Sequence, residues 1–282
     1  MTVTIGLISD THLPDRCRAL PPTVFDALAG VDLVLHAGDV GALSVLDELA
    51  AIAPVIAVHG NDETEGAEHV LPFQQVMFVA GRRVLLTHGH IPDRAQEHAN
   101  RKVDDWQPKL ARWADQAHTA GASIIVYGHT HIPWFIEFDG VWIINPGAIA
   151  SGSHHMRQGV QTVARMTLSD ATHHNSAPPD VAYVNLADLR PYEPAVDVNA
   201  GFVASIINEV IATPDLMAHY DWFFQEVYPL APDPVRNAVR RVMFRCHDGE
   251  IALMDTPDLV AELLNAPDVP GDAKARVEAR FR

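Results

Sequence analysis

The sequence predicts an α/β fold organised around a parallel sheet. Three short apolar runs between residues 3 and 58 are separated by two segments of helical character. Strands that alternate with helices in this order form a parallel sheet through right-handed crossovers. Polar motifs directly follow these runs, and α/β sheets carry their ligand sites at the carboxyl ends of the strands. We therefore expect a functional site at one edge of the sheet.

The elements of this first segment follow from the apolar runs and their end signals. Val3 to Ile8 is typical of a buried strand and stops at Ser9-Asp10. Pro21-Pro22 opens a short helix whose apolar residues share one face. The predicted order is a strand at 3–8, a helix at 21–29, a strand at 32–36, a helix at 43–51 and a strand at 54–58.

A second set of strands is expected between residues 74 and 186. Ala80-Gly81-Arg82 and Asp139-Gly140 each lie between two apolar runs and predict hairpins. A polar stretch at 91–121 contains one expected helix, at about 106–120, with Trp106 and Trp113 on one stripe. The predicted strands are at 74–79, 83–87, 123–127, 134–138, 141–144, 160–168 and 181–186.

The composition changes near Pro191, and the remaining chain is expected to be helical. Apolar residues recur at helical spacing from Phe202 to Ile211, and again from Val235 to Met243. The sequence therefore predicts a domain of residues 1–190 and a helical C-terminal appendage of residues 191–282. Apolar stripes on consecutive helices need a partner surface, so we expect the appendage to cover the first domain or to form a homo-oligomer contact.

Six motifs follow in an order that builds a phosphate site with two metal ions. Five of them supply oxygen and nitrogen ligands at the ends of predicted strands. The motifs are Asp10-Thr11-His12, Gly38-Asp39, Gly60-Asn61, His88-Gly89-His90, Gly128-His129-Thr130-His131 and Asn145-Pro146-Gly147. Side chains two apart on a strand point to the same side, so Asp10 and His12 are expected to bind one ion together. The same holds for His129 and His131 if the chain there is extended.

The ligands divide into two sets that share one carboxylate. Asp39 has two oxygens and is suited to bridge the two ions. The first set is Asp10, His12, Asp39 and His131, and the second set is Asp39, Asn61, His88 and His129. Nitrogen and oxygen ligands without thiolate suit Mn, Fe, Zn, Co or Ni, with Mn preferred here. Two ions about 3.5–4 Å apart clamp a phosphoryl group and lower the pKa of a shared water.

A single motif of this kind carries little information, because Gly-Asp and Gly-Asn are usually turns. The complete set resembles the calcineurin-like metallophosphoesterase superfamily. Thr87-His88-Gly89-His90 and Ile144-Asn145-Pro146-Gly147 are similar to the small bacterial and archaeal phosphodiesterase branch. The resemblance covers about residues 1–187. It implies a four-layer α/β/β/α sandwich with the dimetal site at its strand ends, and the same division of the ligands.

The chain departs from the family pattern after Asn61 and in the stretch 91–121. Many members carry a histidine directly after the asparagine, whereas this chain has Asp62. The catalytic candidates are Asp39, Asn61, His90 and Asp62. Donation of a proton or contact with phosphate by His90 is weighed equally with orientation of His88. For Asp62 we favour a supporting acceptor over a general acid.

The composition limits the class of protein. Of the 282 residues, 48% are hydrophobic and 20% are charged, and the formal net charge is −16. This acidic balance repels nucleic acid, so a nucleic-acid partner is not expected. No apolar run approaches the roughly 18 residues of a membrane span. Cys17 and Cys246 are the only cysteines, which favours a cytoplasmic protein without disulfides.

We therefore expect a dimetal-dependent phosphoesterase that hydrolyses a small phosphodiester or phosphomonoester by attack of a metal-bound hydroxide. One alternative is a non-catalytic metal-binding interaction scaffold of the same fold, and the other is a Mn-dependent nuclease. The complete ligand set disfavours the scaffold, and the acidic charge disfavours the nuclease. The sequence leaves open the native substrate, the metal, the proton donor and the oligomeric state.

Overall fold

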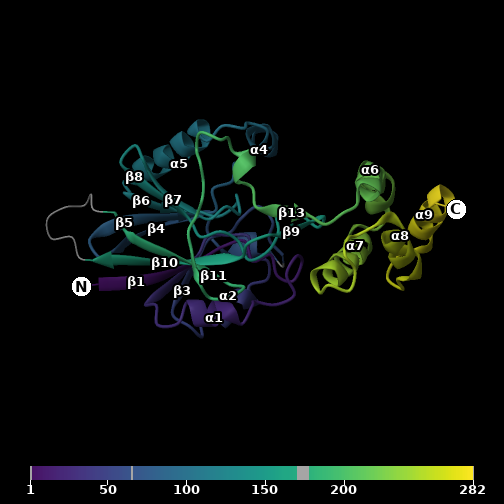
Figure 1. The fold of residues 1–282 in the computed structure, drawn as a ribbon, viewed down its shortest axis with the longest axis horizontal. Helices are drawn as coiled ribbons and strands as arrows, with labels where there is room; N and C mark the ends of the chain where they lie inside the picture. The colour runs from purple at the N-terminus through teal and green to yellow at the C-terminus, as the bar shows by residue number, and fades with distance from the viewer. Residues whose placement is uncertain (1, 65, 170–177, 282) are drawn as a thin grey trace. The chain divides into compact units, whose positions relative to one another are not determined.

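The computed structural model describes residues 2–64, 66–169 and 178–281 (Figure 1). The chain divides into two compact units. The first unit comprises Met1–Ser151 and Gln158–Ile207, and the second comprises Gly152–Arg157 and Asn208–Arg282. The domain boundary at residue 190 stays a prediction. None of the helices among the described residues is both long enough and apolar enough to cross a lipid bilayer.

The first unit contains two sheets. The six-stranded sheet has the order β12-β11-β10-β1-β2-β3, and these strands span Pro191–Tyr192, Asp180–Asn185, Thr162–Ser169, Thr2–Ile8, Leu33–His36 and Val55–Ala57. The five-stranded sheet has the order β4-β5-β6-β8-β7, and these strands span Gln74–Val79, Arg82–Thr87, Ile124–Val126, Val141–Asn145 and Trp134–Phe138. Their positions confirm the strands predicted from the apolar runs.

The two sheets pack face to face between two helical layers. Leu7 and Leu35 of the first sheet share one buried cluster with Leu86 and Val126 of the second. A second cluster joins the first sheet to α1 (Thr23–Ala27) and α2 (Ser44–Leu49), and a third joins the second sheet to α5 (Gln107–Thr119). The fold is therefore the expected four-layer α/β/β/α sandwich, followed by C-terminal helices.

Parallel pairing brings the carboxyl ends of the central strands together. β1 pairs with β2, and β2 with β3, in parallel. In the second sheet β5 pairs with β6, and β6 with β8, also in parallel. Each predicted ligand motif follows one of these strands, so the pairing carries all of them to the same end of the sandwich.

The stretch 91–121 contains a helix that the sequence did not indicate. Besides α5, it forms α4 (Arg94–Arg101), in which Asp93 caps the first turn by accepting from the Gln96 N–H at 2.8 Å. Outside this stretch, the short helix α3 (Ala67–Val70) lies between β3 and β4. α4 carries mostly polar residues, so it has no apolar stripe from which it could be predicted.

The prediction of a helix from Phe202 to Ile211 is wrong. This segment forms a 3₁₀ turn at Val203–Ser205 and then the strand β13 (Asn208–Val210), which pairs with β9 (Met156–Gln158). Its apolar residues do not share a face. The ring of Phe202 packs against Trp106 in the first unit at 5.0 Å, whereas Ile211 belongs to the core of the second.

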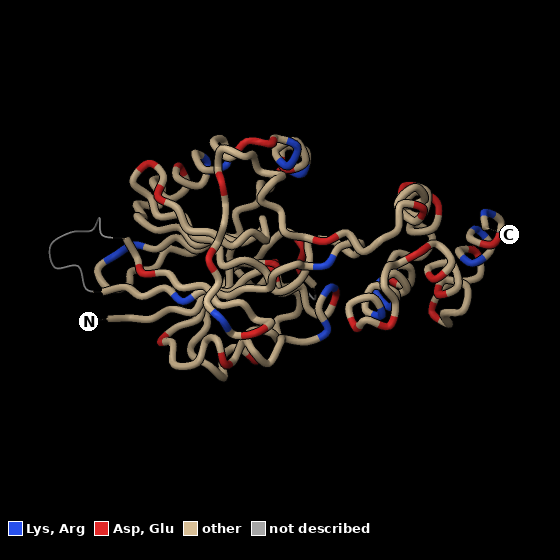
Figure 2. The backbone as a smooth tube through the Cα atoms, viewed as in Figure 1, with Lys and Arg blue, Asp and Glu red and all other residues tan. Residues whose placement is uncertain are grey.

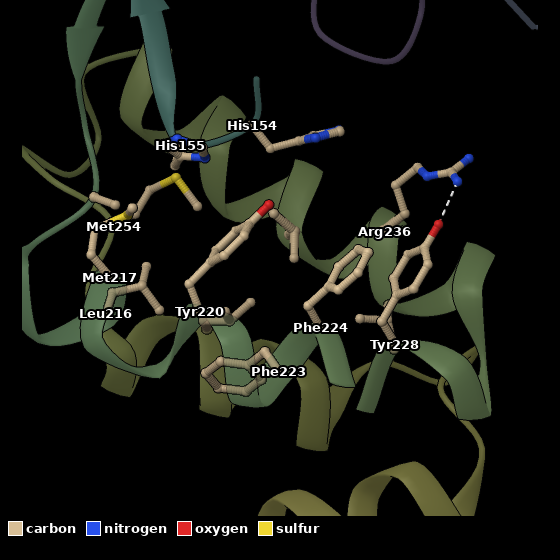
Figure 3. Close-up of a pocket in the computed structure, with 14 residues that line it drawn as sticks. His154, His155, Leu216, Met217, Tyr220, Phe223, Phe224, Tyr228, Arg236 and Met254 are labelled. Atoms are coloured by element: carbon tan, nitrogen blue, oxygen red, sulfur yellow. Dashed lines mark hydrogen bonds between the residues drawn. The ribbon is translucent and has the colours of Figure 1, made fainter. Parts of the chain in front are cut away.

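The second unit is helical from Pro214 onward. Its helices are α6 (Pro214–Trp222), α7 (Pro232–His247), α8 (Thr256–Asn265) and α9 (Gly271–Phe281), with a π-helical segment at Phe223–Val227 and a 3₁₀ turn at Tyr228–Leu230. They bury a separate core. An apolar cavity of about 200 Å³ opens beside this core and is lined by aromatic side chains such as Tyr220, Phe224 and Tyr228 (Figure 3). Tyr228 accepts a hydrogen bond from Arg236 at 2.6 Å.

We predict that Leu263→Ala destabilises the second unit by about 2–5 kcal/mol, because it leaves a cavity in a packed core. Leu263 is fully buried, whereas Leu253 is 46% exposed. Leu253→Ala is the matched control and is expected to change the free energy of unfolding by less than about 0.5 kcal/mol. Urea denaturation followed by circular dichroism measures both. Equal effects of the two substitutions would contradict the packing described for this core.

Candidate metal centre

Five of the predicted ligands lie in a left-handed backbone conformation. The φ angles are 54° for Asp10, 46° for His12, 51° for Asp39, 67° for His129 and 60° for His131. Residues other than glycine rarely adopt this conformation, and it is concentrated at functional sites. The expectation that each Asp-x-His or His-x-His pair lies on extended chain is therefore wrong. These side chains converge because the backbone turns after each strand.

The first group of donors consists of Asp10, His12 and His131. The Nε2 atom of His131 lies 3.1 Å from Oδ1 of Asp10, and Nε2 of His12 lies 3.9 Å from the same oxygen. The two imidazole rings are stacked at 5.4 Å. All three residues are buried, and one donor atom from each falls within 4.8 Å of the others. This arrangement fits a divalent cation bound by one carboxylate and two imidazoles.

The second group is built around Asp39. Its Oδ2 atom lies 3.3 Å from Nε2 of His88 and 3.5 Å from Nε2 of His12. Asp10, Asp39 and His88 again place one donor atom each within 4.8 Å of the others. The Nδ1 atom of His129 lies 3.3 Å from Nε2 of His88. The Asp39 carboxylate therefore faces histidines of both ligand sets, which is the position that a bridging ligand requires.

Hydrogen bonds at one ring nitrogen of His88 and of His129 direct the other nitrogen toward this cluster. The Nδ1–H of His88 donates to the carbonyl of Ala37 at 2.8 Å, so Nε2 is left for a metal. Nε2 of His129 lies 2.7 Å from Oε1 of Glu97. Burial lowers the pKa of His129, although the hydrogen bond to Glu97 opposes the shift. A neutral ring must donate from Nε2 to a carboxylate, which leaves Nδ1 as the ligand atom.

Glycine is required beside both carboxylates. A Cβ atom on Gly60 would lie 2.0 Å from Oδ1 of Asp39, and one on Gly128 would lie 2.7 Å from Oδ2 of Asp10. The glycines of the Gly-Asn and Gly-His motifs therefore make room for the acidic groups of other strands.

The remaining predicted residues lie beside the cluster. Asn61 is exposed and lines an adjoining cavity together with Asp62 and His90. The backbone N–H of Asp62 donates to Oδ1 of Asp39 at 2.8 Å. The side-chain carboxylate of Asp62 forms an ion pair with Arg16. Burial, reinforced by the charge of His88, lowers the pKa of His90 to about 3. His90 is therefore a neutral ring near pH 7.

Three residues at the site were not indicated by the sequence. Arg16 is largely buried and lies 3.4 Å from Nε2 of His12. Glu97 reaches His129 from α4. Glu63 accepts from the N–H groups of Gly41 and Gly60 at 2.8 and 2.6 Å. Glu97 contacts His129 across 32 positions of the sequence, so no local pattern could indicate it. Arg16 lies four residues after His12 and Glu63 three residues after Gly60, so their positions beside two motifs were the only local signals.

The carboxylates and histidines of the cluster shift one another's pKa values. Burial alone would raise the pKa of Asp10, but His131 outweighs it and the pKa falls below its usual range. Burial would likewise raise the pKa of Asp39, and His88 and His12 lower it. Burial would lower the pKa of His88, but the Asp39 carboxylate raises it to about 9. The carboxylates are therefore ionised and ready to bind a cation.

Comparison with known proteins identifies the class. The calcineurin-like phosphoesterase superfamily domain matches residues 3–171. A probable metallophosphoesterase of Methanothermobacter thermautotrophicus is 37% identical over 145 residues, which cover 51% of this chain and 76% of that protein. A phosphodiesterase of Methanocaldococcus jannaschii is 28% identical over 157 residues, which cover 51% and 82%.

The fold is also found among solved structures. Vacuolar Protein Sorting 29 from Cryptosporidium parvum superimposes with a TM-score of 0.53 at 21% identity, covering 68% of this chain and 95% of that one. This likeness supports the fold alone. The family match settles the class: the chain belongs to the calcineurin-like phosphoesterase superfamily. It is a metal-dependent phosphoesterase, a hydrolase of ester bonds.

We predict that Mn²⁺ binding releases a proton near neutral pH, because His88 has a pKa of about 9 without metal and must offer a bare nitrogen to the ion. Affinity should rise up to about tenfold per pH unit below pH 9 and level off above it. Titration calorimetry in buffers of different ionisation enthalpy measures the proton.

The same shift makes the stability of the metal-free protein depend on pH. The folded-state pKa of His88 is raised from 6.5 to about 9, so its pairing with Asp39 stabilises the fold fully below pH 6.5. This contribution is lost as the pH rises through 9. Asp39→Asn is the control for this pH dependence, since it removes the charge that raises the pKa of His88.

Both predictions rest on the raised pKa of His88. A metal affinity that does not change from pH 7 to 9 would contradict it.

Proposed function

We propose that the first unit hydrolyses a small phosphodiester or phosphomonoester with the help of two divalent metal ions. The observation that carries the proposal is the convergence of two carboxylates, Asp10 and Asp39, with four imidazoles at the strand ends. The proposed ligands are Asp10, His12, Asp39 and His131 for one ion, and Asp39, Asn61, His88 and His129 for the other.

The donor atoms suit divalent ions that are hard or of borderline softness. The set consists of carboxylate oxygens, imidazole nitrogens and one amide oxygen, without thiolate, which suits Mn²⁺ and also Fe, Zn, Co or Ni. When bound, such ions neutralise the charge of a phosphoryl group and lower the pKa of a coordinated water. We propose Mn²⁺ as the preferred ion because the carboxylate and amide oxygens suit it, whereas the imidazoles are equally suited to Fe, Zn or Ni.

The chain's own residues hold this arrangement in place. Asn145 donates to the carbonyl of Gly128 at 2.7 Å and to Oγ1 of Thr130 at 3.0 Å, and it accepts from the N–H of Gly147 at 2.8 Å. These bonds fix the loop that carries His129 and His131. Preorganised ligands keep the reacting groups in position and lower the cost of reaching the transition state.

We propose that His90 and Asn61 contact the substrate. Both line the cavity beside the cluster, and a neutral His90 suits donation of a hydrogen bond to a phosphate oxygen. The ion pair with Arg16 favours the carboxylate form of Asp62. Asp62 is therefore proposed to position Arg16 and His12 rather than to protonate the leaving group.

We predict that p-nitrophenyl phosphate or bis(p-nitrophenyl) phosphate is hydrolysed in the presence of Mn²⁺, Co²⁺ or Ni²⁺. His88→Ala and His131→Ala should each lower kcat by more than about 100-fold, because each removes one donor from a different ion. His69→Ala is the matched control, since this ring is 83% exposed and belongs to none of the motifs. Circular dichroism checks that the variants remain folded.

Metal content gives a second measurement of the same proposal. Elemental analysis of the Mn²⁺-reconstituted protein should approach two ions per chain, and Asp39→Ala should lose metal. Undiminished turnover after exhaustive EDTA dialysis would exclude the proposal. A protein that binds two ions but hydrolyses no ester would favour the non-catalytic scaffold, and Mn²⁺-dependent cleavage of DNA alone would favour the nuclease.

We also propose that the C-terminal helices contribute no metal ligand and form a contact between two copies of the chain. Tyr220 and Phe224 are 45% and 55% exposed and adjoin the apolar cavity of the second unit. Exposed aromatic side chains that gather in this way are typical of interfaces.

Sedimentation velocity tests this contact. We predict that the native protein is a dimer and that Phe224→Glu shifts it to a monomer, because a carboxylate would be desolvated at the interface. Phe78→Glu is the control, since Phe78 is 73% exposed but belongs to the first unit. A monomeric native protein would contradict the proposal, and so would a Phe78→Glu variant that dissociates equally.

A further inference from the structure

A cavity of about 630 Å³ lies beside the candidate metal centre, within the first unit. Part of its lining comes from Asn61, Asp62 and His90, which follow β3 and β5. The rest comes from α4 and the residues just before it. Pockets for small organic ligands have volumes of about 300–1,000 Å³, so this cavity holds more than a single phosphate group.

α4 supplies two arginines and a histidine to this cavity. Arg94, His98 and Arg101 all line it, and their spacing of four and three residues places them on one face of the helix. Arg101 donates to Glu97 at 2.9 Å. The side chains of Arg94 and His98 form no hydrogen bond or ion pair with any residue that the structure describes. Figure 2 shows basic positions on α4 in blue, in a chain that contains 36 acidic and 20 basic residues.

Both ends of α4 are held by hydrogen bonds. Near the first turn, Glu97 accepts from the N–H of Ile91 at 2.9 Å while it contacts His129. At the last turn, the buried Lys109 donates to the carbonyls of Asn100 and Val103 at 2.8 and 2.9 Å. The cationic groups therefore stand on a fixed support beside the metal ligands, as a preorganised binding site requires.

The charge of this wall points to an anionic ligand. Although the chain carries a net charge of −16, the side chain of Arg94 has no acidic partner among the described residues. A planar guanidinium binds phosphate through two parallel hydrogen bonds. The scissile phosphoryl group is assigned to the metal ions in the proposed function, so the group that meets α4 is a different part of the substrate.

We propose that this cavity binds the second phosphate of a doubly phosphorylated small molecule, with Arg94 and His98 as its contacts. The inference rests on the proposed phosphoesterase function, since the first phosphate occupies the metal centre. The organic part of the substrate fills the remaining volume. Arg94 is a specificity-determining residue and takes no part in the chemical step.

Paired substrates test the assignment. Alkanediol bisphosphates of increasing length are compared with the alkyl monophosphates of the same chain length, using the Mn²⁺-loaded protein. At the best length, the bisphosphate should have a KM at least about tenfold lower, as expected for one charge-assisted contact. Arg94→Gln should remove this preference while kcat changes by less than about twofold. His98→Gln should weaken the preference.

Arg190→Gln is the matched control, because it makes the same change of charge at a residue that is 82% exposed and outside the cavity. A binding measurement complements the kinetics. Calorimetry with a non-hydrolysable alkanediol bisphosphonate should show tighter binding than the monophosphonate, and Arg94→Gln should abolish the difference. Raised ionic strength should weaken bisphosphonate binding more than monophosphonate binding.

The outcomes separate this inference from the function on which it rests. If the native protein hydrolyses p-nitrophenyl esters but shows no preference for bisphosphates, the second-phosphate site is wrong and the phosphoesterase proposal stands. If no ester is hydrolysed but the bisphosphonate binds in an Arg94-dependent way, the site stands and the proposed function fails. An Arg94→Gln protein that keeps the full preference overturns the assignment of Arg94.

Discussion

The rest of the site depends on the burial of two carboxylates, Asp10 and Asp39, at the ends of parallel strands. Removal of an ionised carboxylate from water costs several kcal/mol unless opposite charge and hydrogen bonds replace the solvent. Here imidazoles supply both: His131 faces Asp10, and His88 and His12 face Asp39. The chain therefore holds two carboxylates inside a packed sandwich, beside histidines with which they could bind divalent cations.

The backbone around these carboxylates is strained to bring them together. Five ligand residues adopt a left-handed conformation, and each such residue costs on the order of 1–3 kcal/mol. The two sheets and their three buried clusters hold the loops in this state. Gly60 and Gly128 complete the arrangement, because any side chain there would collide with a carboxylate. A rigid scaffold thus stabilises loops that would not adopt this geometry in isolation.

α4 contributes both to the orientation of a proposed metal ligand and to the lining of the neighbouring cavity. Through Glu97 it fixes the orientation of His129, and through Arg94 and His98 it lines the neighbouring cavity. Orientation of a ligand and recognition of a substrate therefore depend on one short helix. A change that moves α4 should affect metal affinity and substrate preference together, whereas replacement of a single exposed cation should affect the preference alone.

The sequence by itself determined the strands, their parallel order and the placement of the motifs at their ends. These features are local, because an apolar run and its end signal identify a buried strand without reference to the rest of the chain. Each prediction of this kind was confirmed for β1, β2, β3, β5 and β6. The ligand assignments stay predictions, although the structure brings six of the seven side chains into one cluster and leaves Asn61 at its edge.

Only the tertiary structure decided how the side chains meet. The bond from the His129 N–H to the Asp10 carboxylate and the contact of Glu97 with His129 join residues far apart in sequence. The segment from Phe202 to Ile211 shows the same limit. Its spacing indicates a helix, but its apolar residues are divided between two cores, and long-range packing overrode the local pattern.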